Sequence, residues 1–286
     1  MTASLDPRLN AFRPDLADSR LEGSVDADRF VEGTLRRVAA PSAALRHAPR
    51  PDAALDSELL RGELFRVFEE TDEGWSWGQN QTDGYVAYTA SDALGPVAPE
   101  PTHRITALRT FVYPAPDTKL PARSALSFGA AVSVTGETET RGTRYCLLAG
   151  GEGALVAIHA APIDARPEPD YVAVAERFIG TAYLWGGRTS LGLDCSALVQ
   201  LALMAAGTPA PRDTDMQAAS LGQALPGLGD LKRGDLLYWP GHVAIIADAT
   251  HIVHASGHHM TVVREPLRPA LQRIAEKSGD PKARRL

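Results

Sequence analysis

Short runs in which apolar and polar residues alternate dominate the chain from about residue 31 to residue 163. The run through Leu64, Arg66 and Phe68 is typical, and glycine-containing turns bound it. A period of two residues indicates a strand with one buried face, and closely spaced turn residues join such strands into small all-β domains. This part of the chain is therefore predicted to consist of strands.

The same stretch contains an internal repeat. LRHAPRPDAALDSELLRGELFRVFEE aligns with VYPAPDTKLPARSALSFGAAVSVTGE, which matches Ser57 with Ser124 and Gly62 with Gly129 at an offset of 67. Further on, GYVAYTASDAL aligns with ALVAIHAAPID at an offset of 70, which predicts a three-residue difference in one hairpin loop. A duplicated unit of about 60 residues predicts two small barrels, at residues 31–98 and 103–163.

The residues before the repeat, 1–30, form a polar leader interrupted by prolines. We expect this leader either to pack on a neighbouring domain or to fray. After the repeat, the proline-rich segment PIDARPEPD is predicted to be a linker into a third region, residues 164–286.

The third region has a different pattern. YVAVAERFIGTAY and DCSALVQLALMAAG are predicted helices, the second with Asp194 as its N-cap and Gly207 just past its end. The strand-like runs DLLYW, HVAIIA, IVHAS and MTVVRE follow, then a predicted surface helix, PLRPALQRIAEKSGD, and a basic tail, PKARRL. Helices followed by an antiparallel meander predict an α+β domain.

Composition excludes several classes of protein. The 286 residues carry a net charge of −6, which gives no basic surface for nucleic acid or an anionic membrane. The N-terminus lacks the apolar core of a signal peptide, and no run approaches the roughly 20 apolar residues of a membrane span. The two cysteines, Cys146 and Cys195, do not make a disulfide framework. We therefore expect a cytoplasmic protein with reduced thiols.

Cys195 occupies a position suited to a nucleophile. It starts a predicted helix, where unpaired N–H groups and the helix dipole favour an anion, so its thiol pKa, ordinarily about 8.5, is expected to fall. The same N–H groups can donate to an oxyanion that forms on a substrate. The alternative for Cys195 alone is an inert buried thiol.

Two histidines on consecutive predicted strands supply a candidate base. His242 opens HVAIIA and His254 lies in IVHAS, so adjacent antiparallel strands can bring their side chains together. A histidine oriented by a second polar group can activate a thiol. His251 is three residues from His254 and therefore faces the other way, and the spacing of HIVHASGHH fits no standard zinc pattern. We expect no metal and no cofactor.

These motifs resemble the NlpC/P60 cysteine peptidases of bacterial cell-wall peptide metabolism. The resemblance rests on YLWGGRTSLGLDCSALVQ, PRDTDMQ, LKRGDLLYW, GHVAII and IVHAS, and covers about 110 residues. It implies a papain-like α+β fold with Cys195 as nucleophile, His242 as base and His254 as the residue that orients it. It also implies that the hydroxyl of Tyr183 helps to form the oxyanion hole. Ala197 stands where the family usually has glycine.

The predicted duplication extends the resemblance. Two bacterial SH3-like barrels before such a domain are similar to the γ-D-glutamyl-L-diamino acid endopeptidases that process murein peptides. That similarity implies a first barrel that helps to recognise a free N-terminal L-alanine. The substrate contacts that it implies are Asp194 and Ser196 for the substrate amine, then Asp213, Thr214 and one tyrosine of the first barrel, Tyr85 in preference to Tyr88.

The sequence thus predicts a peptidase that cuts the γ-D-glutamyl–diamino acid bond of short murein peptides with a free N-terminal L-alanine, in peptidoglycan recycling. Its partner is the peptide L-Ala-γ-D-Glu-diamino acid, with no nucleic acid or membrane involved. Two alternatives stay open. One is a cell-wall-peptide-binding protein with a vestigial peptidase domain, and the other is an amidase or acyltransferase on the same fold.

Overall fold

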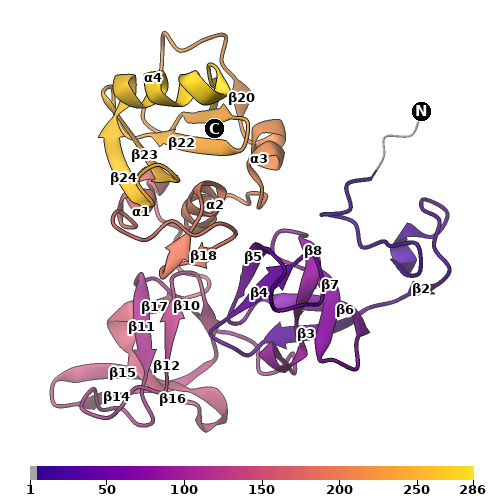
Figure 1. Cartoon of the computed structure of the whole chain (residues 1–286). Helices are drawn as coiled ribbons and strands as arrows, with labels where there is room; N and C mark the ends of the chain where they lie inside the picture. Colours follow the sequence, from indigo (N-terminus) through magenta and orange to yellow (C-terminus); the bar gives the residue numbers. More distant parts are fainter. Residues whose placement is uncertain (1–4) are drawn as a thin grey trace. The chain divides into compact units, whose positions relative to one another are not determined.

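The computed structural model describes residues 5–286, and the chain divides into two compact units at the Ala165–Arg166 boundary (Figure 1). The first unit is built almost entirely of strands, and the second combines helices with one large sheet. Within the described residues, no helix is both long and apolar enough to cross a membrane.

The first unit contains a seven-stranded sheet of order β5-β4-β8-β7-β6-β3-β9. Its strands are β3 (Thr34–Val38), β4 (Ser42–Arg46), β5 (Leu55–Leu60), β6 (Leu64–Glu70), β7 (Trp75–Asn80), β8 (Val86–Ala90) and β9 (Leu94–Gly95). A short 3₁₀ helix, η2 (Ser91–Ala93), precedes β9. Neighbouring strands pair antiparallel throughout, which is the arrangement of a small barrel.

In β6, Phe65 and Val67 point into the barrel core, whereas Leu64 and Arg66 are half-buried. Phe68 lies on the other face of the sheet, as alternation requires, and clusters there with Trp77. The pairing of β6 with β7 shifts register between Val67 and Glu69. The sequence pattern thus predicts the alternation, but not which of the two faces covers the barrel core.

The leader packs on this barrel. Strand β1 (Ala17–Asp18) pairs parallel with β2 (Phe30–Val31), and a 3₁₀ turn, η1 (Ser19–Leu21), follows β1. Leu16 is fully buried and clusters with Phe68 and Trp77. The Arg13 guanidinium lies 4.3 Å from the ring centre of Trp77 and 2.7 Å from a carboxylate oxygen of Glu69. Of the two expected outcomes, packing is therefore the one observed for the described residues of the leader.

A second β-rich region completes the first unit, with three small sheets of orders β13-β10-β17, β11-β12 and β14-β15-β16. Its strands are β10 (His103–Ile105), β11 (Arg109–Val112), β12 (Ser124–Ser127), β13 (Ala131–Val132), β14 (Val134–Thr140), β15 (Thr143–Leu148), β16 (Gly153–Val156) and β17 (Ala160–Pro162). Two 3₁₀ turns, η3 (Ala149–Gly151) and η4 (Ala157–His159), lie between strands. The region has its own core around Ile105, Leu126 and Leu155.

The two β-rich regions share a succession of elements. Gly62 and Gly129 occupy matching turns with φ of 85° and 86°, as the offset of 67 requires. The closing 3₁₀ turns η2 and η4 correspond at an offset of 66, so the expected shift to 70 is wrong. The two regions are therefore aligned by their matching turns and 3₁₀ helices, and not by the residue matches between GYVAYTASDAL and ALVAIHAAPID. The assignment of an SH3-like barrel to the second region stays a prediction.

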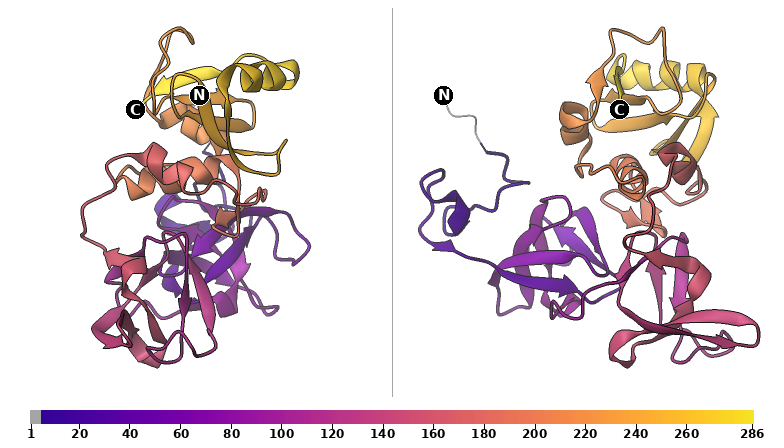
Figure 2. Two further views of the ribbon diagram at one scale, coloured as in Figure 1. Left: turned by 90° about the vertical axis from the view of Figure 1, so that its left-hand side faces the viewer. Right: turned by 180° about the vertical axis from the view of Figure 1, so that it is seen from behind.

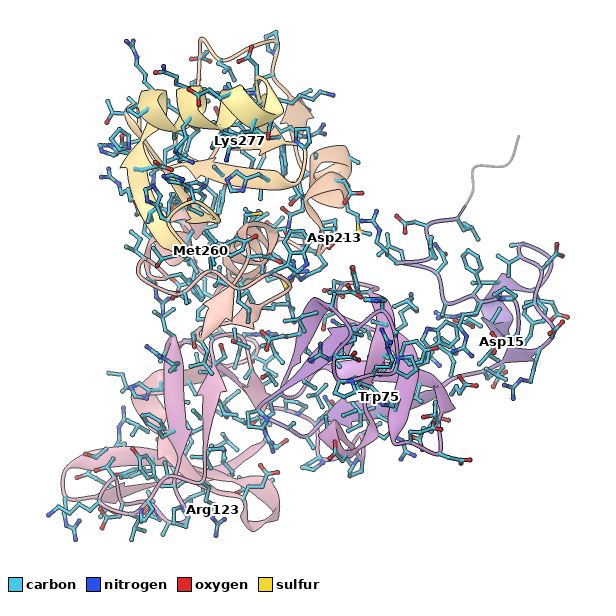
Figure 3. All side chains as sticks on the ribbon, viewed as in Figure 1. Asp15, Trp75, Arg123, Asp213, Met260 and Lys277 are labelled. Carbon is cyan, nitrogen blue, oxygen red and sulfur yellow. The ribbon has the colours of Figure 1, made fainter. Side chains whose placement is uncertain are left out.

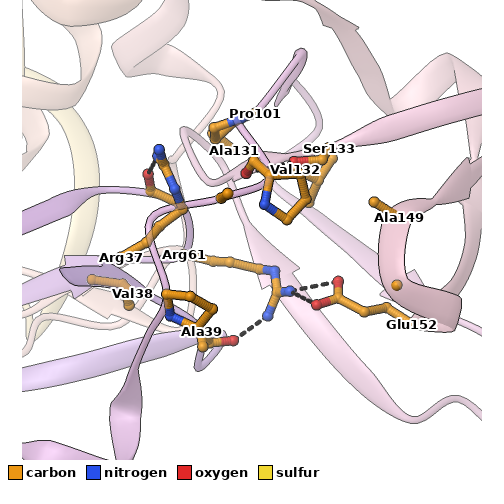
Figure 4. Close-up of a pocket in the computed structure, with 15 residues that line it drawn as sticks. Arg37, Val38, Ala39, Arg61, Pro101, Ala131, Val132, Ser133, Ala149 and Glu152 are labelled. Atoms are coloured by element: carbon orange, nitrogen blue, oxygen red, sulfur yellow. Dashed lines mark hydrogen bonds and ion pairs between the residues drawn. The ribbon is translucent and has the colours of Figure 1, made fainter.

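A cavity of about 170 Å³ lies where the two β-rich regions meet within the first unit (Figure 4). Arg61 lines this cavity and forms an ion pair of 2.5 Å with Glu152, which also lines it. Beside it, a Cβ added to Gly62 would come within 2.5 Å of the carbonyl oxygen of Ala131. Gly62 therefore serves two requirements, a left-handed turn and a close approach of backbones.

The second unit is the salmon-to-yellow part of the ribbon in Figure 2. Its six-stranded sheet has the order β20-β25-β21-β22-β23-β24. The strands are β20 (Gln223–Ala224), β21 (Leu236–Trp239), β22 (His242–Ile246), β23 (His251–Ser256), β24 (Thr261–Pro266) and β25 (Lys282–Arg285). The helices are α1 (Tyr171–Glu176), α2 (Cys195–Ala205), α3 (Thr214–Ser220) and α4 (Leu267–Ser278). A two-stranded ribbon, β18 (Arg188–Thr189) with β19 (Gly192–Leu193), precedes α2.

The predicted helices and strands of this unit are present, with several differences. Helix α1 is shorter than predicted, and α3, β20 and the ribbon of β18 with β19 were not predicted. The basic tail is a strand, because β25 inserts between β20 and β21. Ala283 is buried there, and Arg285 forms an ion pair of 2.7 Å with the buried Asp235. A short strand rich in charged residues gives little apolar periodicity, which explains why it reads as a tail.

We predict that Gly62→Ala destabilises the first unit more than Gly74→Ala does. Both glycines have φ near 85°, so alanine is strained at either position, at about 1 kcal/mol. Only at Gly62 would the new methyl group also collide with backbone, since nothing lies within 4 Å of the corresponding point at Gly74. Urea denaturation of both variants measures the difference, and equal losses of stability would contradict the close approach.

Candidate active site

Cys195 is the first residue of α2, as predicted. Asp194 is the N-cap, and one of its carboxylate oxygens accepts a hydrogen bond of 2.9 Å from the N–H of Ala197. Gly207, just past the helix, has φ of 79° and ends it. The residues of α2 from Cys195 to Leu203 are all buried, so packing holds the Cys195 thiol in place.

The Cys195 thiol lies against the start of β22. Its sulfur is 3.9 Å from the carbonyl oxygen of Gly241, and it also accepts a hydrogen bond from the N–H of Val243. These are the two neighbours of His242 in the chain. On its other side, the sulfur lies 3.8 Å from the hydroxyl of Thr214. The fold thus brings the thiol to the backbone on both sides of His242.

Burial, together with the nearby charge of Asp194, raises the pKa of the Cys195 thiol to about 11. The expectation of a lowered pKa is therefore wrong for this protein without substrate. With only 5% of Cys195 exposed, the loss of hydration penalises the thiolate more than the helix N-terminus and the hydrogen bond from Val243 favour it. The resting thiol is neutral at pH 7.

His242 and His254 form a direct hydrogen bond. The Nε2 atom of His242 is 2.7 Å from the Nδ1 atom of His254. The two residues belong to β22 and β23, and the register Ile245 opposite Val253 makes the histidines diagonal neighbours on one face of the sheet. His251 lies on the opposite face of β23 and contacts Asp248 instead.

Glu265 on β24 continues this chain of hydrogen bonds and was not found from the sequence. Its Oε1 atom lies 2.6 Å from Nε2 of His254 and 2.5 Å from Nη2 of Arg273. Burial alone would raise the pKa of Glu265, but the hydrogen bonds from His254 and Arg273 outweigh it and lower that pKa to about 2. The carboxylate is therefore ionised at neutral pH.

The ionised carboxylate fixes the protons along the chain. A carboxylate only accepts, so Nε2 of His254 must carry the proton and donate it. Burial lowers the pKa of His254, which leaves its Nδ1 atom unprotonated and able to accept from Nε2–H of His242. Burial and the neighbouring His254 also lower the pKa of His242, to about 3. The proton-accepting nitrogen of His242 is then Nδ1.

Asp194 and Ser196 are engaged within the protein. The carboxylate of Asp194 forms a two-pronged ion pair with Arg212, at 2.7 and 3.0 Å, and Gly186 donates to it as well. The hydroxyl of Ser196 donates to Asp194 and accepts from Arg212. Only 1% of Arg212 is exposed. Asp194 therefore has protein partners in the absence of substrate, and its expected contact with a substrate amine stays a prediction.

The other predicted site residues divide between the two units. Asp213 is the N-cap of α3, which places Thr214 beside the thiol. Tyr183 borders a cavity with both histidines, and burial raises the pKa of its phenol to about 12. Tyr85 lies in the first unit with its side chain in the core of the seven-stranded barrel, 6% exposed, and its expected contact with substrate stays a prediction. The hydroxyl of Tyr88, on the opposite face, contacts Arg13 at 2.5 Å.

A cavity of about 410 Å³ adjoins the imidazoles of His242 and His254. Strand and turn residues form one wall, and helix α4 forms the other. Within residues 5–286, no three or more His, Cys, Asp or Glu side chains are grouped so as to hold a metal ion. The chemistry that this arrangement supports is nucleophilic attack by sulfur with an imidazole as proton carrier.

Comparison with known families agrees with this geometry. Residues 180–274 match the profile of the NlpC/P60 family. The second unit is an NlpC/P60 domain. Residues 45–94 match the bacterial dipeptidyl-peptidase Sh3 domain, which places an SH3 domain in the seven-stranded barrel ahead of the NlpC/P60 domain.

Curated relatives match over part of the chain. Dipeptidyl-peptidase 6 of Lysinibacillus sphaericus is 38% identical over 89 residues, which cover 30% of this chain and 31% of the relative. Gamma-D-glutamyl-L-lysine dipeptidyl-peptidase of Bacillus subtilis (strain 168) is 40% identical over 70 residues, 24% of this chain and 23% of the relative. The matched segments thus span about a quarter to a third of these two relatives.

A solved structure matches almost the whole chain in fold. The crystal structure of an NlpC/P60 family protein from Bacillus cereus ATCC 10987 superposes with a TM-score of 0.71, covering 88% of this chain and 99% of that one. The two share 19% sequence identity, so the likeness concerns the fold. The papain-like α+β domain behind a β-rich N-terminal unit is confirmed in this way.

We predict that Glu265→Leu changes the protonated nitrogen of His242, whereas Glu265→Gln preserves it. Leucine leaves Nε2 of His254 without an acceptor. Glutamine keeps a carbonyl oxygen between His254 and the guanidinium of Arg273, because that guanidinium can only donate. Long-range ¹H–¹⁵N NMR spectra of the imidazoles report the tautomer directly. An unchanged His242 tautomer in the leucine variant would show that Glu265 does not set it.

We also predict that alkylation of Cys195 by iodoacetamide accelerates continuously from pH 6 to pH 9. A thiol pKa of about 11 means that the thiolate fraction grows about tenfold per pH unit below that value. Mass spectrometry of the peptide that contains Cys195 gives the alkylation rate. The alkylation rate of free glutathione by iodoacetamide at the same pH values is the reference. A plateau between pH 6 and 8 would instead indicate a stable thiolate–imidazolium pair.

Proposed function

We propose that this protein is a cysteine peptidase that hydrolyses the γ-D-glutamyl–diamino acid bond of short cell-wall peptides with a free N-terminal L-alanine. A role in peptidoglycan recycling belongs to the same proposal. The protein has an NlpC/P60 peptidase domain, and one of its relatives bears the name of a gamma-D-glutamyl-L-lysine dipeptidyl-peptidase. Those two facts give the reaction class and suggest the bond.

One observation carries the proposal. A buried thiol at a helix N-terminus lies against the backbone of a histidine whose Nε2 atom is tied into a chain with His254 and Glu265. This chain leaves Nδ1 of His242 as the proton acceptor. A structural cysteine needs no such arrangement, whereas a nucleophile of neutral resting charge requires a base that can take its proton during attack.

In the acylation step, Sγ of Cys195 attacks the carbonyl carbon of the γ-amide while its proton passes to Nδ1 of His242. The oxyanion accepts hydrogen bonds from the N–H of Cys195 and the hydroxyl of Tyr183, whose raised pKa keeps it protonated. The imidazolium is stabilised through His254 by the carboxylate of Glu265. It then donates its proton to the leaving amine, and a thioester forms.

In the deacylation step, water replaces the amine. Neutral His242 takes a proton from this water, which attacks the thioester carbonyl, and the thiol leaves with the proton returned by the imidazolium. The same residues serve both steps in opposite directions. No group beyond the described residues and water is needed to balance the reaction.

Recognition of a free amine cannot rest on Asp194 alone, because Arg212 already neutralises this carboxylate. We keep the preference for a free N-terminus in the proposal because two relatives are named dipeptidyl-peptidases. That name is used for enzymes that cleave at a fixed position from the N-terminus of a peptide. Acetylation of the substrate amine tests the preference separately from the chemistry.

We predict that Cys195→Ala abolishes cleavage of L-Ala-γ-D-Glu-L-Lys, whereas Cys146→Ala leaves it nearly unchanged. Cys146 is a matched control, because it too is a buried free thiol but belongs to the core of the second β-rich region. Mass spectrometry of the products identifies the bond cut, and a loss of at least about 10³-fold is expected for the nucleophile.

Other outcomes would change the proposal in defined ways. Equal cleavage of the free and the N-acetylated peptide would leave the peptidase and remove the amine preference. Binding of the peptide without cleavage by the unmodified protein would favour a binding protein. Transfer of the acyl group to an added amine in preference to water would favour an acyltransferase.

A further inference from the structure

The cavity beside His242 and His254 is lined by several basic side chains. Of the side chains that line it, Arg273, Lys277 and His258 are basic, and the lining contains no Asp or Glu. This stands out in a chain with a net charge of −6. The volume of about 410 Å³ lies within the range of small-molecule sites, roughly 300–1,000 Å³.

The two cations of α4 differ in what they contact. Arg273 and Lys277 are four residues apart and therefore lie on the same side of the helix. The Arg273 guanidinium is held 2.5 Å from the ionised carboxylate of Glu265. Lys277, labelled in Figure 3, is exposed. Among the described residues, no hydrogen bond or ion pair is found for its ammonium group. Lys277 is thus the cation available to a ligand.

The chemistry of the proposed reaction indicates which part of the substrate enters this cavity. His242 gives its proton to the leaving amine, so the leaving amino acid must lie next to that imidazole, and His242 borders the cavity. In a γ-D-glutamyl–diamino acid bond this amine is attached to the α-carbon, which also bears a carboxyl group. That group is a free anion only when the peptide ends at the diamino acid.

We propose that this cavity holds the leaving amino acid and that Lys277 binds its free α-carboxylate. The inference rests on the function proposed above and narrows it to peptides that end at the diamino acid, such as tripeptides. A further residue joined to that carboxyl group would remove the charge and leave Lys277 without its partner. A competing explanation is that Lys277, in the last turn of α4, only stabilises the helix dipole.

The test compares L-Ala-γ-D-Glu-L-Lys with the same peptide carrying a C-terminal amide. The unmodified protein should cleave the acid with a kcat/KM roughly tenfold higher, the effect of one partly exposed charge-assisted contact. Lys277→Met should remove this preference by raising KM for the acid alone, and Lys277→Arg should retain most of it. Arg268→Met is the matched control, since Arg268 is exposed on the same helix and does not line the cavity.

The possible results separate the two proposals. Equal cleavage of acid and amide by the unmodified protein would overturn the carboxylate site and leave the peptidase function intact. A preference that survives in Lys277→Met would overturn the assignment to Lys277. A lowered melting temperature with unchanged KM in that variant would favour the helix-dipole explanation. Cleavage of neither peptide by the unmodified protein would overturn the proposed function and this inference with it.

Discussion

The buried ion pair between Asp194 and Arg212 is the interaction on which the geometry of the nucleophile depends. Asp194 caps α2 and contacts Ser196, so the two residues that flank Cys195 are both fixed by one guanidinium. Arg212 also lies two residues before α3, whose first residue, Thr214, contacts the thiol. Loss of one partner of such a buried pair strongly destabilises the fold, because the remaining partner is left as an unpaired charge without water around it. Cys195 is therefore positioned by electrostatics as well as by packing.

The register of three strands sets the second half of the site. His242, His254 and Glu265 lie diagonally across β22, β23 and β24, and a slip of one residue in either pairing would turn a member to the opposite face. The pairing of β23 with β24 is fixed by the turn from Gly257 to Met260. Met260 adopts φ of 56° there, a conformation unusual for a side chain with a Cβ.

This dependence on register explains what could be predicted from the sequence. The capped helix of Cys195 and the two histidine strands follow from local pattern, and the structure contains them. Glu265 and Arg212 do not follow from local pattern, because a glutamate in MTVVRE or an arginine in PRDTDMQ reads as ordinary surface charge until strand register and burial are known. The burial of Tyr85 could not be predicted for the same reason, because Tyr85 lies within the turn before β8, where alternation does not fix the side that it faces.

Two acidic groups flank the reacting pair, and each is matched by an arginine. Asp194 with Arg212 lies on the side of the thiol, and Glu265 with Arg273 lies on the side of the imidazoles. Because each carboxylate is neutralised locally, the site can orient Cys195 and His242 without imposing a large net negative field on them. Both reacting groups are neutral at rest, since burial disfavours their charged forms. In the proposed reaction, charge therefore develops only when a substrate carbonyl is attacked, and it develops between an oxyanion held by N–H and O–H donors and an imidazolium stabilised by Glu265. An unpaired acid at either position would favour the imidazolium in the resting protein. It would also oppose the oxyanion during the proposed reaction. The two arginines therefore matter to the electrostatics of the site as much as the two carboxylates do.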